Sequence, residues 1–416
     1  MVAFRFRTGA HELSLVELPW HLPLEEWPVE RSVVLPAGVH RHVVRFMEIA
    51  GNTVALKELP DRLAEREYTM LEGLREEKLP GVSLIGIATE RFSPDGEPLE
   101  GVLVTRHLRY SLPYRMLFSD QQFEALQDRV VDALAVLLVR LHLEGFFWGD
   151  CSLNNALFRR DAGALRAYVV DTETAEWHEQ LTDGQRSYDL QIAVENVLGG
   201  LFDLQASDML NPDVEPETVA LRLEERYRSL WSELNDEEEI PTTELGRIHA
   251  RLNRLNALGF DTEECELRAS DGIARFRPTI VEEGHHVRTL ERLTGVRAHE
   301  NQARRLLAAL RGYGAWLSQT EGEVLPEAVV AYRWLVERYQ PTLQLMPDDL
   351  RDRLEDPEIY HEILEHNWYM NEAAGGEIDL IAAALDYVDN VLTHQPDERT
   401  VLPLDGLPTD GLSPER

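Results

Sequence analysis

The stretch from residue 120 to residue 171 constrains the fold more than any other part of the chain. Its first part (120–145) carries a wide apolar stripe at helical spacing, which predicts a buried helix. The loop "GDCSLNN" follows and contains Asp150 and Asn155. Two short apolar runs then flank a turn with glycine, and the second run ends at Asp171. This order of helix, loop and hairpin places three oxygen-bearing side chains at the ends of regular elements.

The chain before this stretch is predicted to be a small sheet with one inserted helix. Gly51-Asn52 is a two-residue turn typical of a β-hairpin, and it separates strands at 42–50 and 53–59. Residues 61–77 repeat apolar side chains at helical spacing. "GVSLIGIATER" and "PLEGVLVTRHL" then predict two more strands.

Charged residues lie at unusual places in this sheet and helix. Lys57 interrupts the apolar strand "VALKEL", and Glu67 in the next helix is an available partner for its charge. Phosphoryl transfer from a nucleotide needs a Lys held by a Glu, a carboxylate beside the acceptor, and an Asn and an Asp that hold Mg²⁺. The alternatives are a lysine that reaches water from an edge strand, and turn residues bound to loop backbone.

The motifs, in this order, resemble the protein-kinase-like superfamily. "VALK" is similar to the strand with the nucleotide-binding Lys, "GDCSLNN" to the catalytic loop, and "VVDTET" to the segment with the second metal-binding Asp. The resemblance implies ATP and Mg²⁺ as cofactors, with Lys57 and Glu67 at the nucleotide. It also implies that Asp150 is the catalytic carboxylate and that Asn155 and Asp171 are metal ligands.

Further nucleotide contacts follow from the same resemblance. The nucleotide loop of the superfamily is rich in glycine, whereas "LPAGVHRHVVRF" contains Gly38 alone. We hypothesise that His40, Arg41 and His42 replace backbone amides as phosphate contacts. Thr105 and His107, at the end of the fourth strand run, complete the expected nucleotide-binding set.

Several positions depart from the pattern of protein kinases. Trp148-Gly149 stand in place of His-Arg, Ser152 in place of Lys, and Thr-Glu-Thr in place of Phe-Gly after Asp171. These features are closer to lipopolysaccharide kinases and aminoglycoside phosphotransferase-like enzymes, which implies a hydroxyl acceptor on a small molecule or saccharide. The alternative is a weak or inactive pseudokinase that binds nucleotide and a protein partner. Asp189 in "SYDLQIA" resembles the helix Asp that braces the catalytic loop.

The second half, with "ARLNRLNALGFD" and "ENQARRLL", resembles the DUF4032 family of unknown function. The expected fold is α+β: a bilobal kinase-like fold, followed by a mostly helical C-terminal domain with a small hairpin at 265–281. The expected domain boundaries are an arm (1–24), a kinase-like domain (25–205, with lobes 25–108 and 109–205), a helical domain (206–392) and a disordered tail (393–416).

Composition limits the partners and the compartment. The chain has 75 Asp and Glu against 41 Lys and Arg, a net charge of −34, which excludes nucleic acid as an expected partner. No run predicts a signal peptide or a membrane span. Two cysteines, Cys151 and Cys265, fit a reducing compartment, so we expect a cytoplasmic protein. Cys151 adjoins an acid and is expected to be a packing residue.

Two further clusters have open interpretations. A basic group follows His285-His286, and its arginines are Arg288, Arg292, Arg297, Arg304, Arg305 and Arg311. The group is either an anion site or a helix face paired with acidic neighbours, and the second interpretation is favoured. "HEILEHNWYMNE" (361–372) has His and Glu one helical turn apart, which suits a divalent metal. Packing around Trp368 and Tyr369 is the favoured role for that segment.

Overall fold

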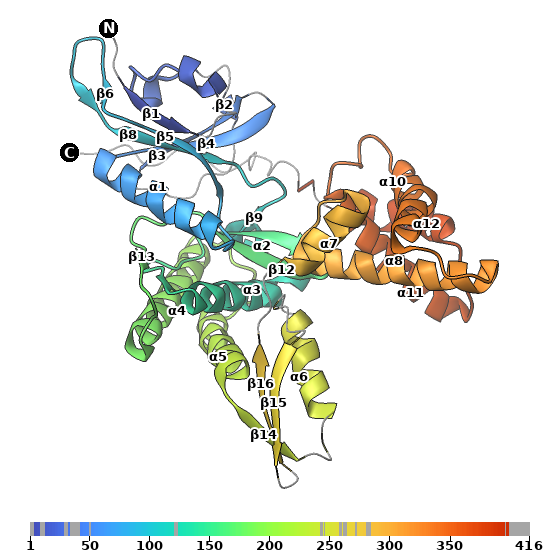
Figure 1. Cartoon of the computed structure of the whole chain (residues 1–416). Coiled ribbons are helices and arrows are strands. Elements are labelled where there is room, and N and C mark those ends of the chain that lie inside the picture. Colours follow the sequence, from blue (N-terminus) through green and yellow to red (C-terminus); the bar gives the residue numbers. More distant parts are fainter. Residues whose placement is uncertain are drawn as a thin grey trace.

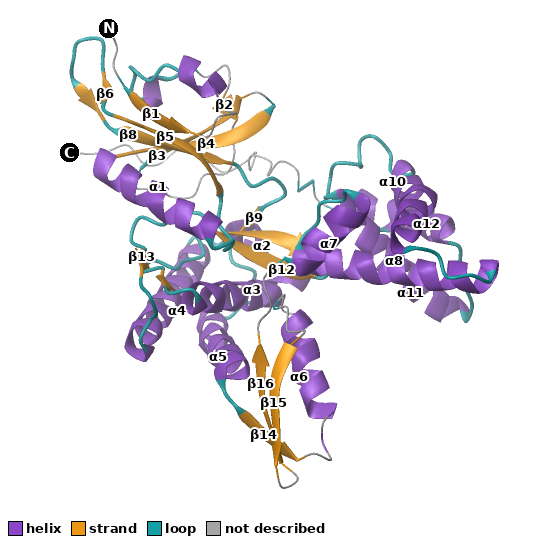
Figure 2. Cartoon of the chain, viewed as in Figure 1, coloured by secondary structure: helices purple, strands orange, loops and turns teal. Residues whose placement is uncertain are grey.

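The protein has an α+β fold with two lobes at the N-terminal side and a mostly helical C-terminal part (Figures 1 and 2), as the sequence predicted. The computed structural model describes residues 4–8, 13–28, 32–33, 42–49, 51–119, 124–241, 244, 246–257, 260, 264–270, 273–279, 284–395 and 397–398.

The small lobe is a six-stranded antiparallel sheet in the order β1-β5-β8-β4-β3-β2, with one long helix beneath it. Its elements are β1 (Arg5–Thr8), β2 (Ser32–Val33), β3 (Val43–Ile49), β4 (Asn52–Leu59), α1 (Asp61–Glu76), β5 (Ser83–Thr89) and β8 (Gly101–Arg106). Gly51 has a φ of 76°, the conformation that the tight turn between β3 and β4 requires. The four predicted strands and the inserted helix are therefore confirmed.

The segment that we predicted as a separate arm contributes to this sheet. β1 pairs antiparallel with β5 along its whole length. Two short 3-10 helices (Leu13–Glu17 and Leu24–Glu26) follow β1. Buried Trp20 and Trp27 then cover the sheet on the side away from α1, in a core of their own. The pairing of two strands so far apart in the sequence cannot be predicted from the local residue pattern of either strand.

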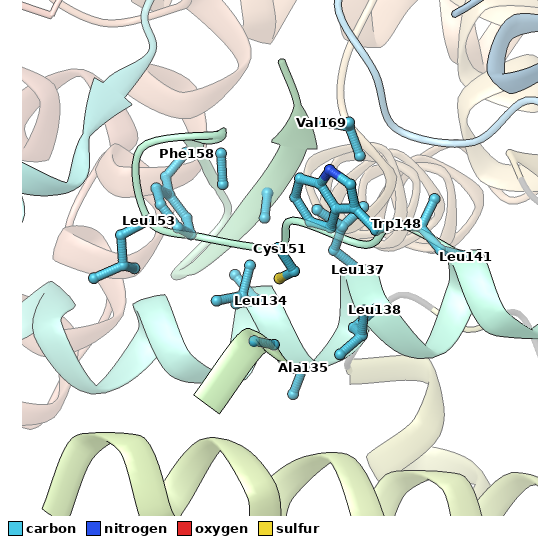
Figure 3. Packing of buried hydrophobic residues seen from close by; sticks show 14 of the residues in the cluster. Leu134, Ala135, Leu137, Leu138, Leu141, Trp148, Cys151, Leu153, Phe158 and Val169 are labelled. Carbon is cyan, nitrogen blue, oxygen red and sulfur yellow. The ribbon is translucent and has the colours of Figure 1, made fainter. Parts of the chain in front are cut away.

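The large lobe is built around one buried helix. Its elements are β9 (Leu112–Pro113), α2 (Tyr114–Ser119), α3 (Glu124–Leu143), β10 (Phe146–Phe147), β11 (Ala156–Asp161), β12 (Ala164–Val169), β13 (Glu176–Trp177), α4 (Asp183–Ala206) and α5 (Pro216–Asn235). Figure 3 shows the apolar residues of α3 packed against Trp148, Cys151 and Leu153 of the loop that follows it. Cys151 is fully buried, and burial raises the pKa of its thiol, so its predicted packing role is confirmed.

The core of the large lobe continues beyond residue 205, where we expected a domain boundary. Leu223, Tyr227, Leu230 and Leu234 of α5 belong to the same buried cluster as α3 and α4. A smaller body follows, with α6 (Gly246–Ala257) and a three-stranded sheet of β14 (Glu238–Pro241), β15 (Glu264–Ser270) and β16 (Ile273–Thr279). β15 and β16 confirm the predicted hairpin.

The last part is a helical bundle set against the end of the β11–β12 hairpin (Figure 1). Its helices are α7 (His285–Thr294), α8 (Glu300–Glu321), α9 (Glu327–Trp334), α10 (Gln340–Gln344), α11 (Asp356–Ala374) and α12 (Leu380–Asn390). Among the described helices none is long and apolar enough to cross a membrane. Of the predicted tail, Glu398 is described, and its side chain is buried.

Candidate active site

Lys57 lies at the centre of a charged cluster between the lobes. Its Nζ atom donates hydrogen bonds to Glu67 Oε2 at 2.9 Å and to Asp171 Oδ2 at 2.6 Å. The three side chains come from β4, α1 and the end of β12, far apart in sequence. The structure therefore brings together three of the residues that the sequence analysis selected.

The electrostatics of this cluster follow from its burial. Glu67 is 1% exposed, and burial together with the nearby Asp171 raises its pKa to about 7, against the lowering effect of Lys57. Burial lowers the pKa of Lys57, but the two carboxylates outweigh this effect and the net shift is upward. Lys57 is therefore a fixed positive charge, while Glu67 ionises near neutral pH.

Replacing Glu67 with Gln is expected to change how stability depends on pH. The folded pKa of Glu67 is about 7 and its ordinary value is 4.5, so ionising Glu67 opposes folding. The protonated Glu67 carboxyl therefore favours the folded state. This contribution is complete when the pH is below the ordinary pKa of 4.5, and it is lost as the pH rises through the folded-state pKa of about 7. The amide does not titrate. The free energy of unfolding of the wild type relative to Glu67→Gln should therefore fall by about 2–3 kcal/mol between about pH 5 and about pH 8.

Urea unfolding at both pH values measures this difference. Glu76→Gln, an exposed change on the same helix α1, is the control and should leave the pH dependence unchanged. Parallel stability profiles for wild type and Glu67→Gln would show that the Glu67 carboxyl is not perturbed.

Asp171 is fixed by contacts on both sides of its carboxylate. The backbone N–H of Glu173 donates to Asp171 Oδ1 at 3.0 Å, while Lys57 holds the other oxygen. The indole Nε1 of buried Trp148 donates to the backbone oxygen of Asp171 at 2.9 Å. Trp148 stands where protein kinases have a His, and here it links the loop that contains Asp150 to the segment that contains Asp171.

Asp150 is oriented by two amide side chains. Asn155 Nδ2 donates to Asp150 Oδ2 at 3.0 Å, and Asn196 Nδ2 donates to Asp150 Oδ1 at 3.0 Å. Asn196 lies on α4, and the sequence analysis missed it. Its position two turns after Asp189 on the same helix face was the available signal.

Asp189 braces the loop that contains Asp150, as the resemblance implied. Its Oδ2 accepts the backbone N–H of Trp148 at 2.7 Å, and its Oδ1 accepts that of Gly149 at 2.8 Å. His142 Nε2 contacts the same carboxylate at 3.0 Å, and Tyr227 OH contacts His142 Nδ1 at 2.6 Å. Burial lowers the pKa of His142. The neutral ring therefore donates to Asp189 and accepts from Tyr227, a contact that sequence reasoning also missed.

A cavity of about 120 Å³ lies above this cluster, between the small sheet and the hairpin. Lys57, Thr105, His107, Asn155 and Asp171 all line it, together with apolar residues of both lobes. Burial lowers the pKa of His107 to about 4, so the ring is neutral. Of the other expected nucleotide contacts, His42 contacts Glu173 Oε2 through its Nε2 atom at 3.2 Å. Gly38, His40 and Arg41 lie outside the described residues.

The donor atoms around this cavity suit Mg²⁺. Within the described residues no group of three or more His, Cys, Asp or Glu side chains is placed to hold a metal ion. Asn155 uses its amide nitrogen for Asp150, which leaves the amide oxygen as a donor atom beside the Asp171 carboxylate. Mg²⁺ typically takes one or two such oxygens from a protein and completes its shell with phosphate and water.

The other candidate sites have different outcomes. In the segment 361–372, His366 pairs with Asp386 at 2.7 Å, and Glu362 accepts the Tyr387 hydroxyl at 2.6 Å, so their partners come from α12. Trp368 and Tyr369 are 56% and 57% exposed, so our prediction that the segment packs around them was wrong.

The basic group near residue 285 is paired with acidic neighbours in part, as at His286 and Arg297. His286 contacts Glu300 at 2.7 Å, Arg297 contacts Glu291 at 3.0 Å, and Arg304 donates to the Asn301 side chain at 3.2 Å.

The two lobes, the Lys57–Glu67 pair and the braced loop define a kinase-like domain. Residues 36–193 match the family model described as the lipopolysaccharide kinase (Kdo/WaaP) family, and residues 229–392 match the domain of unknown function DUF4032. These matches confirm both resemblances inferred from the motifs. No curated protein matches the chain. One similar solved structure, WaaP in complex with acyl carrier protein, has 16% identity and a TM-score of 0.37, covering 61% of this chain and 99% of that chain.

Proposed function

We propose that the protein is an ATP- and Mg²⁺-dependent phosphotransferase that acts on a hydroxyl group of a small molecule or saccharide. The observation that carries this proposal is Lys57, whose amine bridges Glu67 and Asp171 in the floor of a cavity between two lobes. The match of residues 36–193 to a lipopolysaccharide kinase family supports the same class of reaction.

Each polar side chain has a distinct role in this proposal. Lys57 binds and orients the nucleotide phosphates, and Glu67 holds its amine in place. Asn155 and Asp171 would hold Mg²⁺, which supplies neutralisation of the phosphate charge when bound. Asp150 accepts the hydrogen bond of the acceptor hydroxyl and aligns its oxygen with the phosphate. The amides of Asn155 and Asn196 donate to this carboxylate and fix its direction.

The choice of acceptor rests on the departures in the catalytic loop. Ser152 stands where protein kinases have a Lys, two residues after the Asp that corresponds to Asp150. With these departures the loop is more similar to that of lipopolysaccharide and small-molecule kinases than to that of protein kinases. The match of residues 36–193 to a lipopolysaccharide kinase family supports the same choice. A free hydroxyl compound is therefore the proposed acceptor class, in preference to a protein side chain.

Turnover of Mg²⁺-ATP with a panel of saccharides and small alcohols tests the proposal. Asp150→Asn should lower the rate by about 100-fold or more, because the acceptor hydroxyl loses its orienting carboxylate, and should leave ATP affinity unchanged. Asn196→Ala should give a smaller loss of about 10-fold, since Asn155 still holds Asp150. If the wild type binds ATP but phosphorylates no acceptor, the proposed enzymatic activity is contradicted and the alternative of a nucleotide-binding pseudokinase is supported.

A further inference from the structure

The tip of the β11–β12 hairpin is hydrogen-bonded to the C-terminal part of the chain. Asp161 Oδ1 accepts the backbone N–H of Gln302 at 2.9 Å, at the N-terminus of α8, where a carboxylate is favourable. The N–H of Ala162 donates to Glu358 of α11 at 2.8 Å. Arg160 donates to Glu398 at 2.7 Å. The seam, meaning the contact between this hairpin tip, α3, α8 and α11, thus joins the two family-matched parts of the chain.

Two cavities flank this hairpin tip. The smaller, of about 240 Å³, lies between α3, the hairpin and the start of α8, and the larger, of about 420 Å³, lies between the hairpin and α11. Arg129, Gly163 and Ala164 line both of them. The larger volume is that of a site for a small metabolite. Neither cavity contains a residue of the candidate active site.

Among the described residues, three basic side chains that line the larger cavity lack the kind of partner that Arg160, beside them, has in Glu398. Within the described part of the chain, Arg129, Arg305 and His361 make no hydrogen bond and no ion pair, although all three line the larger cavity. His361 is 7% exposed. Burial, and to a smaller extent the neighbouring Arg305, lower the pKa of Arg304 on the same helix.

The carboxylates of the same walls are already engaged. Glu358 accepts from Ala162 and from the Gln302 side chain at 2.7 Å, and Glu362 accepts from Tyr387. In the smaller cavity Asp161 caps α8, Asp132 pairs with Arg226 at 3.0 Å, and Glu300 pairs with His286. There are two exceptions among the described residues: Glu365 is exposed and lines the larger cavity, and the buried Oε2 atom of Glu300, in the smaller cavity, has no hydrogen-bond partner. In the larger cavity the groups left to face a ligand are therefore chiefly cationic.

We propose that the seam binds a phosphate-bearing small molecule in the larger cavity, between Arg129 and Arg305. Guanidinium groups donate paired hydrogen bonds that match the oxygens of a phosphate, and the buried imidazole of His361 adds another polar contact. This site lies apart from the nucleotide cavity and does not depend on the function proposed for it.

Calorimetric titration of the full chain with inorganic pyrophosphate tests the site. The Lys57→Ala background removes competing phosphate contacts at the nucleotide cavity. In that background Arg129→Gln and Arg305→Gln should each weaken pyrophosphate binding about 10-fold or more. Arg311→Gln, an exposed change on the same helix α8 outside the cavity, should have no effect.

A fourth variant tests the sign of the charge that the site accepts. Glu365→Gln should strengthen pyrophosphate binding about twofold to fivefold, because it removes negative charge from the rim. The proposal is overturned if pyrophosphate does not bind at about 1 mM, or if Arg129→Gln and Arg305→Gln bind it as tightly as their parent.

Discussion

Asp171→Asn is expected to weaken Mg²⁺-ATP binding about 100-fold and to abolish the dependence of ATP affinity on Mg²⁺. The amide retains the size of the side chain and can still accept the Glu173 N–H, so the local backbone should remain in place. It loses the negative charge that both the Mg²⁺ ion and Lys57 require. Calorimetric titration with ATP, in the presence of Mg²⁺ and in excess chelator, measures the effect.

The control for this change is Glu179→Gln, an exposed replacement in the segment that follows the same loop. It should leave both titrations unchanged. Equal Mg²⁺-ATP affinity in wild type and Asp171→Asn would show that Asp171 is not a ligand of the metal.

Asp189→Ala is expected to lower the free energy of unfolding by about 3–5 kcal/mol. The carboxylate is fully buried and accepts hydrogen bonds from the backbone N–H groups of Trp148 and Gly149 and from His142. Removing it leaves these donors without an acceptor in the core. Urea unfolding, followed by tryptophan fluorescence, measures the change.

Asp203→Ala lies on the same helix α4 but is exposed, so it provides a matched control with an expected change below about 0.5 kcal/mol. Tyr227→Phe removes the hydrogen bond to the far side of His142 and should cost about 1 kcal/mol. Equal stability of Asp189→Ala and the control would mean that the loop is held by its apolar packing alone.

The sequence predicted those site residues whose signal is local. Lys57 interrupts an apolar strand, Asp150 and Asn155 share one loop, and Asp171 ends a strand, so pattern and resemblance were enough to select them. The structure places all of them around one cavity or beside it.

The contacts that sequence reasoning missed are all long-range. Asn196 holds Asp150 from another helix, and Tyr227 reaches His142 across the boundary expected at residue 205. β1 joins the sheet through pairing with β5. A single sequence has no pattern for such pairs, because each partner is individually an ordinary polar or strand residue.

The β11–β12 hairpin has a consequence for the independence of the two halves. Its strands begin directly after Asn155 and end just before Asp171, while its tip carries Arg160 and Asp161, which are held by C-terminal residues. Cutting the chain between the family-matched parts would leave those charges and the apolar walls of the seam in water. We therefore expect the two parts to unfold as one cooperative unit, and the kinase-like part to lose stability when it is produced without the C-terminal helices.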